Sequence, residues 1–122
     1  MTDFEDELTR VAEHEPRVLA WVTRHSDDNL RSLARSVPDG PLTGWTLGIK
    51  DIIDTSDLPT ERGSAIYAGR QTSNDAPCVA LARAAGALVV GKTATTEFAF
   101  VTPTVTTNPH NAERTPGGSS SG

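Results

Sequence analysis

The chain has one cysteine, few aromatic side chains, no long apolar run and no cluster of basic residues. A single cysteine excludes an internal disulfide. No apolar stretch approaches the roughly 20 residues that a membrane-spanning helix needs, so we expect no membrane span. The net charge is −5, and no stretch gathers Lys and Arg without intervening acids. We therefore expect no direct nucleic-acid partner bound through its phosphates.

The N-terminus and the isolated side chains predict neither targeting nor metal chemistry. Residues 1–6, Met-Thr-Asp-Phe-Glu-Asp, are acidic where a signal peptide is basic and then apolar, which favours a cytoplasmic protein. Cys78 lies among apolar residues, so a buried core thiol is favoured over a nucleophile. The histidines are scattered and lack the spacing of metal ligands, so no metal is expected (His14, His25 and His110).

Residues 1–40 predict an N-terminal helical segment. Apolar residues recur at helical spacing over residues 4–12, and Pro16 is expected to interrupt this first helix. A second helical turn or two is predicted over residues 18–22. The oxygens of residues 27–29 could cap a third helix with an apolar stripe over residues 30–37, which a Pro- and Gly-rich turn ends. We expect these helices to form a lid or packing layer.

Residues 41–122 predict an α/β core. β-branched and apolar residues crowd into residues 44–54, which is typical of a buried strand and includes Lys50. A helix is predicted from Asp75 to about Ala85, closed by Gly86, followed by a short buried strand over residues 87–91. A helix between two buried strands is typical of an α/β fold with a covered sheet.

The segment Gly86–Thr93 satisfies the letters of a phosphate-binding P-loop, but its predicted structure differs. In a P-loop a strand precedes the first glycine and a helix begins at the Lys-Thr pair. Here a helix precedes Gly86, and the residues before Gly91 are strand-like. A helix stop followed by a core strand explains the same letters, so we do not expect nucleotide binding.

Lys50 and the glycine- and serine-rich residues 117–122 are the candidates for chemistry. Apolar neighbours around Lys50 would partly desolvate an ammonium and favour the neutral amine, which can accept a proton. The local sequence alone favours a lysine that extends from a strand end toward solvent. Hydroxyls in residues 119–121 can relay protons to an amine, although such a cluster is equally typical of a loop or an anion-binding nest.

Taken together, these motifs and their order resemble the amidase signature family. The resemblance covers about residues 44–122. The other matching motifs, in chain order, are Thr60 with Gly63-Ser64, the helix between Asp75 and Gly86, Gly91-Lys92-Thr93, Glu97-Phe98-Ala99, and Asn108-Pro109 before Thr115-Pro116. The family often has a second threonine after the one at Thr60. Here Glu61 and Arg62 stand there instead, which we expect to alter the edge of the site rather than its chemistry.

The resemblance implies a mixed sheet covered by helices, of which residues 41–122 would be the N-terminal part, truncated. Lys50 would be the catalytic base. Ser119, held by a cis peptide bond, would pass to it the proton of a second, nucleophilic serine. Supporting roles fall to Ser120 as a hydrogen-bond donor and to Gly117 and Gly118, since a glycine at 118 avoids a side-chain clash. Asp51 is expected to orient Lys50 or to cap a turn. The nucleophile itself would follow residue 122, so this chain is expected to be inactive alone.

The resemblance also implies an activity for the full-length protein. It would hydrolyse small linear carboxamides through an acyl-enzyme, with no cofactor. One alternative is the amidase subunit of a glutamine-dependent tRNA amidotransferase, which would need a partner subunit. Residues 98–103 and 108–111 favour a stand-alone amidase. Another alternative is a catalytically dead binding or folding module. A homodimer of the full-length protein is left open.

Overall fold

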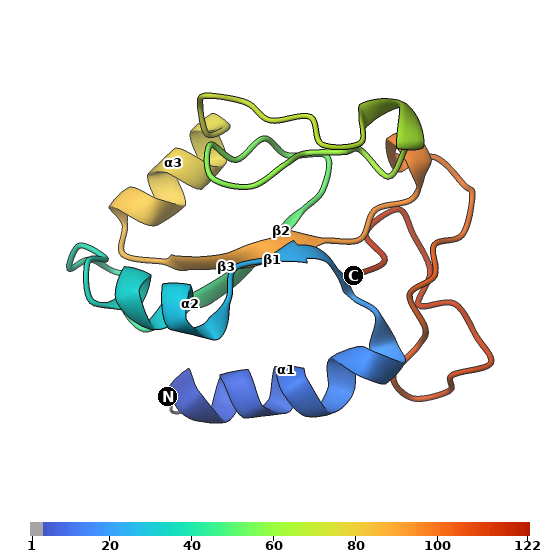
Figure 1. Ribbon diagram of the computed structural model, residues 1–122, viewed down its shortest axis with the longest axis horizontal. Helices are drawn as coiled ribbons and strands as arrows, with labels where there is room; N and C mark the ends of the chain where they lie inside the picture. The colour runs from blue at the N-terminus through green and yellow to red at the C-terminus, as the bar shows by residue number, and fades with distance from the viewer. Residues whose placement is uncertain (1–3) are drawn as a thin grey trace.

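The computed structural model describes residues 4–122, and at its centre lies a mixed three-stranded sheet (Figure 1). Residues 1–3, part of the acidic N-terminal motif, lie outside the described residues. The strands are β1 (Trp21–Arg24), β2 (Thr46–Lys50) and β3 (Leu88–Thr93), in the spatial order β1-β3-β2. The central strand β3 is antiparallel to β1 and parallel to β2. The chain is thus the predicted α/β fold, with helices on both faces of the sheet.

β3 forms the middle of the molecule because both of its faces are covered. Its first five residues are buried, as expected for a parallel strand packed on both sides. Val89 packs into the cluster on one face and Val90 into the cluster on the other, since successive side chains of a strand alternate. Gly91 lets β1 approach, because a Cβ there would lie 2.6 Å from the carbonyl oxygen of Thr23. A larger residue would force the two strands apart.

Helices α1 (Phe4–Val18) and α2 (Asp27–Ala34) cover one face of the sheet (Figure 1). Leu8 of α1 and Leu30 of α2 pack with Val90, flanked by Phe4 and Trp21. These two helices therefore form a packing layer on this face of the sheet. α2 begins at a capping Ser26, whose hydroxyl accepts a hydrogen bond from the amide of Asn29 at 3.3 Å.

Helix α3 (Pro77–Ala84) covers the other face, where Val79 packs against Ile49 and Val89. Proline stands in its first turn, where a missing amide hydrogen costs nothing. Gly86 follows the helix at φ +96°, a conformation that favours glycine and turns the chain into β3. This helix and strand lie close to their predicted bounds. Two short 3-10 helices, Ala65–Tyr67 and Glu97–Ala99, lie in the connecting loops.

The structure corrects the prediction for residues 16–24. α1 continues through Pro16 to Val18, and residues 21–24 form strand β1 instead of a helical turn. Glu15 accounts for the entry into β1, because its carboxylate accepts hydrogen bonds from the amides of Ala20 and Trp21 at 3.0 and 2.9 Å. These bonds turn the chain directly from the helix into the sheet. The predicted segment of residues 1–40 is therefore not wholly helical, because β1 belongs to the central sheet.

Two further expectations differ from the structure. α2 ends at Ala34, earlier than the predicted stripe to Val37. Cys78 is exposed, not buried, because α3 turns Val79 toward the sheet and its neighbour, about 100° further round the helix, faces solvent. Apolar neighbours in the sequence did not identify the buried face of this helix. Among residues 4–122, no helix combines the length and the apolar character needed to cross a bilayer.

Candidate active site

Lys50 is the last residue of β2, and its amine points to Ser119. The Nζ of Lys50 donates a hydrogen bond to the Oγ of Ser119 at 2.6 Å, across 69 positions of sequence. Beyond Lys50 the chain turns, since the amides of Ile52 and Ile53 both donate to the Lys50 carbonyl oxygen, at 2.8 and 2.9 Å. Both side-chain partners are half-buried. The structure therefore brings together the two residues that the sequence singled out.

Hydrogen bonds to the extension of β3 hold the segment around Ser119. The amide of Thr96 donates to the Ser119 carbonyl oxygen at 3.0 Å, and the amide of Ser121 donates to the Ala94 carbonyl oxygen, also at 3.0 Å. The peptide bond between Gly118 and Ser119 is cis, as the resemblance implies. A Cβ at Gly118 would lie 2.9 Å from the Cγ2 of Thr96, so glycine allows this close packing.

The three consecutive serines occupy different environments. Ser120 is exposed and pairs through its backbone with Thr95 as an isolated bridge. Ser121 is buried, and its Oγ donates to the Gly117 carbonyl oxygen at 3.0 Å, which closes the loop on itself. The supporting role predicted for Ser120 stays a prediction. Sequence reasoning left Ser121 unassigned, and nothing in a run of identical residues marks the one that is buried.

Next to Lys50 lies a buried ion pair that sequence reasoning missed. Asp51 and Lys92 are both fully buried, and the Lys92 Nζ lies 3.2 Å from the Asp51 Oδ1. The Nζ also donates to the Thr60 Oγ1 at 2.6 Å and to the Pro59 carbonyl oxygen at 3.2 Å. Asp51 was predicted to orient Lys50 or to cap a turn. Its carboxylate binds Lys92 and accepts the amide of Glu61, and its effect on the orientation of Lys50 stays a prediction.

Burial shifts the pKa values of both partners of this pair. Loss of solvent raises the pKa of the Asp51 carboxyl, against the opposing effect of the nearby Lys92 amine. Burial likewise lowers the pKa of the Lys92 amine, against the opposing effect of Asp51. The Lys92 of the P-loop pattern lies in strand β3, and its amine points into the protein interior. The segment is therefore a core strand and not a phosphate-binding loop. An isolated lysine within an apolar strand is the signal that could have predicted a buried acidic partner.

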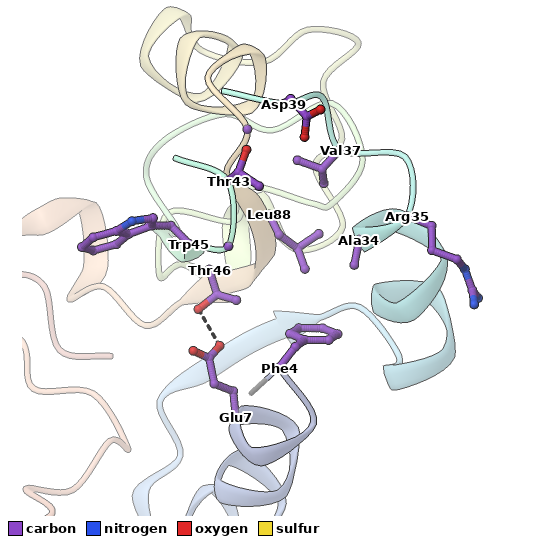
Figure 2. A pocket seen from close by; sticks show the side chains of 12 residues that line it. Phe4, Glu7, Ala34, Arg35, Val37, Asp39, Thr43, Trp45, Thr46 and Leu88 are labelled. Carbon is purple, nitrogen blue, oxygen red and sulfur yellow. Dashed lines mark hydrogen bonds between the residues drawn. The ribbon is translucent and has the colours of Figure 1, made fainter. Parts of the chain in front are cut away.

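A cavity of about 520 Å³ lies at the opposite ends of the strands from the Lys50–Ser119 contact (Figure 2). Thr46 and Leu88, the first residues of β2 and β3, line it together with Phe4 and Glu7 of α1. The Glu7 carboxylate accepts a hydrogen bond from the Thr46 hydroxyl at 2.8 Å. Lys50 and Ser119 do not line this cavity. The candidate active site is therefore the Lys50–Ser119 contact and not the cavity. Within residues 4–122, no three His, Cys, Asp or Glu side chains gather as a metal site.

Comparison with known protein families identifies the chain. The family model described as Amidase matches residues 5–122. This chain belongs to the amidase family. The match includes both Lys50 and Ser119 and extends through α1, α2 and β1, well before the region in which the motifs were recognised.

Relatives of this chain are similar to it in both sequence and fold. A chloroplastic/mitochondrial glutamyl-tRNA(Gln) amidotransferase subunit of Oryza sativa subsp. indica is 38% identical over 94% of this chain and 24% of its own length. The crystal structure of the corresponding glutamyl-tRNA(Gln) amidotransferase subunit from Thermotoga maritima superposes with a TM-score of 0.81 at 30% identity, covering 96% of this chain and 26% of that one. The peptide amidase of Stenotrophomonas maltophilia superposes with a TM-score of 0.78 at 30% identity, covering 96% and 28%.

These amidase-family proteins are longer than the sequence described. The chain spans about a quarter of the length of the curated relatives it matches. It contains the Lys50–Ser119 contact and the sheet that carries it.

Proposed function

We propose that this chain supplies the base and the proton-relaying serine of an amide hydrolase. The observation that carries the proposal is the 2.6 Å hydrogen bond between the Lys50 amine and the Ser119 hydroxyl. A neutral amine at this distance can accept the hydroxyl proton of Ser119, within the range required for general-base catalysis. Membership of the amidase family supports the same assignment.

In the proposed reaction Ser119 stands between the base and the nucleophile. Lys50 takes the hydroxyl proton of Ser119, and the Ser119 oxygen takes the proton of a second serine. That serine attacks the carbonyl carbon of the amide and forms a C–O bond. The C–N bond then breaks, and the amine leaves after receiving the proton back from Lys50 through Ser119. Water hydrolyses the resulting ester by the same proton path and regenerates the serine.

The second serine and the oxyanion-binding amides are proposed to come from sequence beyond the 122 residues described. Relatives about four times as long support this view, since most of their chain has no counterpart here. A lysine and a relay serine alone cannot form an acyl-enzyme. We therefore expect residues 1–122 expressed alone to release no ammonia from amides.

The substrate class proposed for the complete protein is a small linear carboxamide. The test is ammonia release from such amides by the protein expressed from its complete reading frame, compared with the Lys50→Ala and Ser119→Ala variants. We expect both variants to lose activity by at least about 10,000-fold, the order found when a catalytic triad member is removed. Ser73→Ala, which alters an exposed serine, is the matched control and should retain full activity. Full activity in Lys50→Ala would overturn the proposal.

A second candidate function is the glutamine-hydrolysing subunit of a tRNA amidotransferase. The 36–39% identity to curated relatives named as glutamyl-tRNA(Gln) amidotransferase subunits favours it. The two candidates differ in their dependence on other proteins. Rapid hydrolysis of simple amides by the isolated protein supports the stand-alone amidase. Hydrolysis of glutamine only after a partner subunit is added supports the amidotransferase. Neither activity under any of these conditions supports a non-catalytic binding module.

A further inference from the structure

Lys50 and Lys92 are the only lysines in the sequence, and they lie beside each other in the sheet. In the parallel pairing of β2 with β3, Lys92 lies opposite Ile49, and Lys50 lies opposite Thr93. The two amines nevertheless have different environments. Lys50 is half-buried and reaches Ser119, whereas Lys92 is fully buried and reaches Asp51.

The Asp51–Lys92 contact fixes the residue that follows Lys50. The Asp51 amide donates to the Thr93 carbonyl oxygen at 2.9 Å, so backbone and side chain both attach this position to β3. The Asp51 carboxylate also accepts the amide of Glu61, which ties in the segment that holds Thr60. Because Asp51 is held in the interior by these bonds, the direction in which the neighbouring Lys50 side chain leaves the backbone is restricted.

The same strand and its extension hold the other partner of the catalytic contact. Residues 94 and 96, directly after β3, bind the backbone of Ser119 and Ser121. The extension of β3 thus holds the backbone of Ser119. Lys92 of β3 holds Asp51, the residue that follows Lys50. The 2.6 Å separation of Lys50 Nζ and Ser119 Oγ therefore depends on contacts that both partners make with β3 and its extension.

We propose that the buried Lys92–Asp51 ion pair positions Lys50 for proton exchange with Ser119. This inference rests on the proposed function, since it assigns Lys92 and Asp51 a role in the same reaction. Lys92 and Asp51 are positioning residues: they act through Lys50 and do not touch the reacting atoms. Removing one partner leaves a buried charge unpaired, which destabilises the fold, whereas removing both charges avoids that penalty.

The experiment separates positioning from stability by comparing Lys92→Met with the double variant Lys92→Met/Asp51→Asn. In the double variant the asparagine oxygen can still accept the Glu61 amide, and no charge is left unpaired. Each protein is made from the complete reading frame, and its urea unfolding, kcat and KM for a small amide are measured. We expect the double variant to recover most of the stability lost in Lys92→Met. We expect its kcat to stay about 100-fold below wild type, with little change in KM, because a small misplacement of a reacting group has an effect of this order.

Asp54→Asn is the matched control. It breaks the partly exposed ion pair between Asp54 and Arg70 in the loop after Lys50, and its kcat should equal that of wild type. Thr60→Val keeps the ion pair but removes the 2.6 Å hydrogen bond to Lys92, so it should show a smaller loss of kcat in a folded protein. This variant tests the inference even where the double variant does not fold.

The outcomes distinguish this inference from the proposed function. Full activity in Lys50→Ala would overturn both. Loss of activity in Lys50→Ala, together with wild-type kcat in the folded double variant or in Thr60→Val, would overturn the positioning role alone. Recovery of kcat in step with stability would also overturn it, because a merely structural pair predicts that result.

Discussion

Two glycines determine the backbone path into Ser119. Gly117 has φ +92°, a conformation that L side chains rarely adopt, and its Cβ position is open. Gly118 instead packs so closely that a Cβ would lie 2.9 Å from Thr96. The first glycine is needed for backbone conformation and the second for space. Both lie directly before the proposed relay serine.

Gly117→Ala should reduce stability and activity together. Alanine at φ +92° costs about 1–2 kcal/mol relative to glycine, because its Cβ crowds the neighbouring carbonyl oxygen. Gly69→Ala is the matched control, since Gly69 also has a positive φ of +71° and open space around its Cβ position. In the protein expressed from its complete reading frame, urea unfolding should show similar losses for both variants, while ammonia release falls only in Gly117→Ala. Equal activity in the two would contradict a role for the Gly117 conformation at the site.

The Asp54–Arg70 pair predicts a pH-dependent contribution to stability. A hydrogen bond from Arg70, together with its charge, lowers the pKa of the Asp54 carboxyl. The folded state therefore favours the ionised form. The contribution of the Asp54–Arg70 pair to the free energy of unfolding is complete above the unfolded-state pKa of about 4. It is lost as the pH falls through the lower pKa of the folded state.

Urea unfolding of Asp54→Asn at a series of pH values tests this sign. The variant should be less stable than wild type at pH 7, and the difference should shrink toward zero as the pH falls well below about 4. Asp39→Asn, which alters an exposed acid, should show no such trend. A stability difference that grows toward low pH would show that the sign is wrong.

Single residues of the site could be predicted from sequence only where they belong to a recognisable motif. The contact between Lys50 and Ser119 was implied by the resemblance to the amidase signature family, because the local patterns around each residue favoured a solvent-directed lysine and an ordinary loop equally well or better. The Asp51–Lys92 pair was not predicted, because it depends on the register of β2 against β3. No local pattern encodes which residues of two strands lie opposite each other.

At the scale of elements, the passage from α1 to β1 was the least predictable part of the fold. Residues 18–22 have apolar spacing that fits a helical turn, yet they leave the helix and enter the sheet. The decisive contacts come from one side chain, Glu15, and from the pairing of β1 with β3. α3 and β3 were predictable because each has its own signals, with Pro77 and Gly86 bounding the helix and buried apolar residues forming the strand.

Glu15→Ala should destabilise the fold by about 1.5–3 kcal/mol, since hydrogen bonds to a charged group contribute on this order. The variant loses the carboxylate that accepts the amides of Ala20 and Trp21. Glu13→Ala lies in the same helix and alters an exposed acid, so it serves as the matched control. Urea unfolding should separate the two variants clearly. Equal stability would mean that the turn into β1 does not depend on Glu15.

At the scale of the whole molecule, the candidate active site lies at the carboxyl ends of the parallel strands. β2 ends at Lys50, and the extension of β3 binds the segment around Ser119, with the loops gathered on that side (Figure 1). Open α/β sheets bind ligands outside the carboxyl ends of their strands. The cavity beside Thr46 and Leu88 lies at the amino ends, where this rule predicts no chemistry. The architecture and the side-chain chemistry therefore agree on one location.

A double-mutant cycle on Lys50 and Ser119, in the protein expressed from its complete reading frame, tests whether the two residues form one proton relay. The kcat/KM for a small amide is measured for wild type, Lys50→Ala, Ser119→Ala and the double variant. If the two residues form one proton relay, the double variant loses about as much activity as either single variant, because each change already breaks the relay. Losses that multiply in the double variant would show that Lys50 and Ser119 act independently, and would contradict the relay.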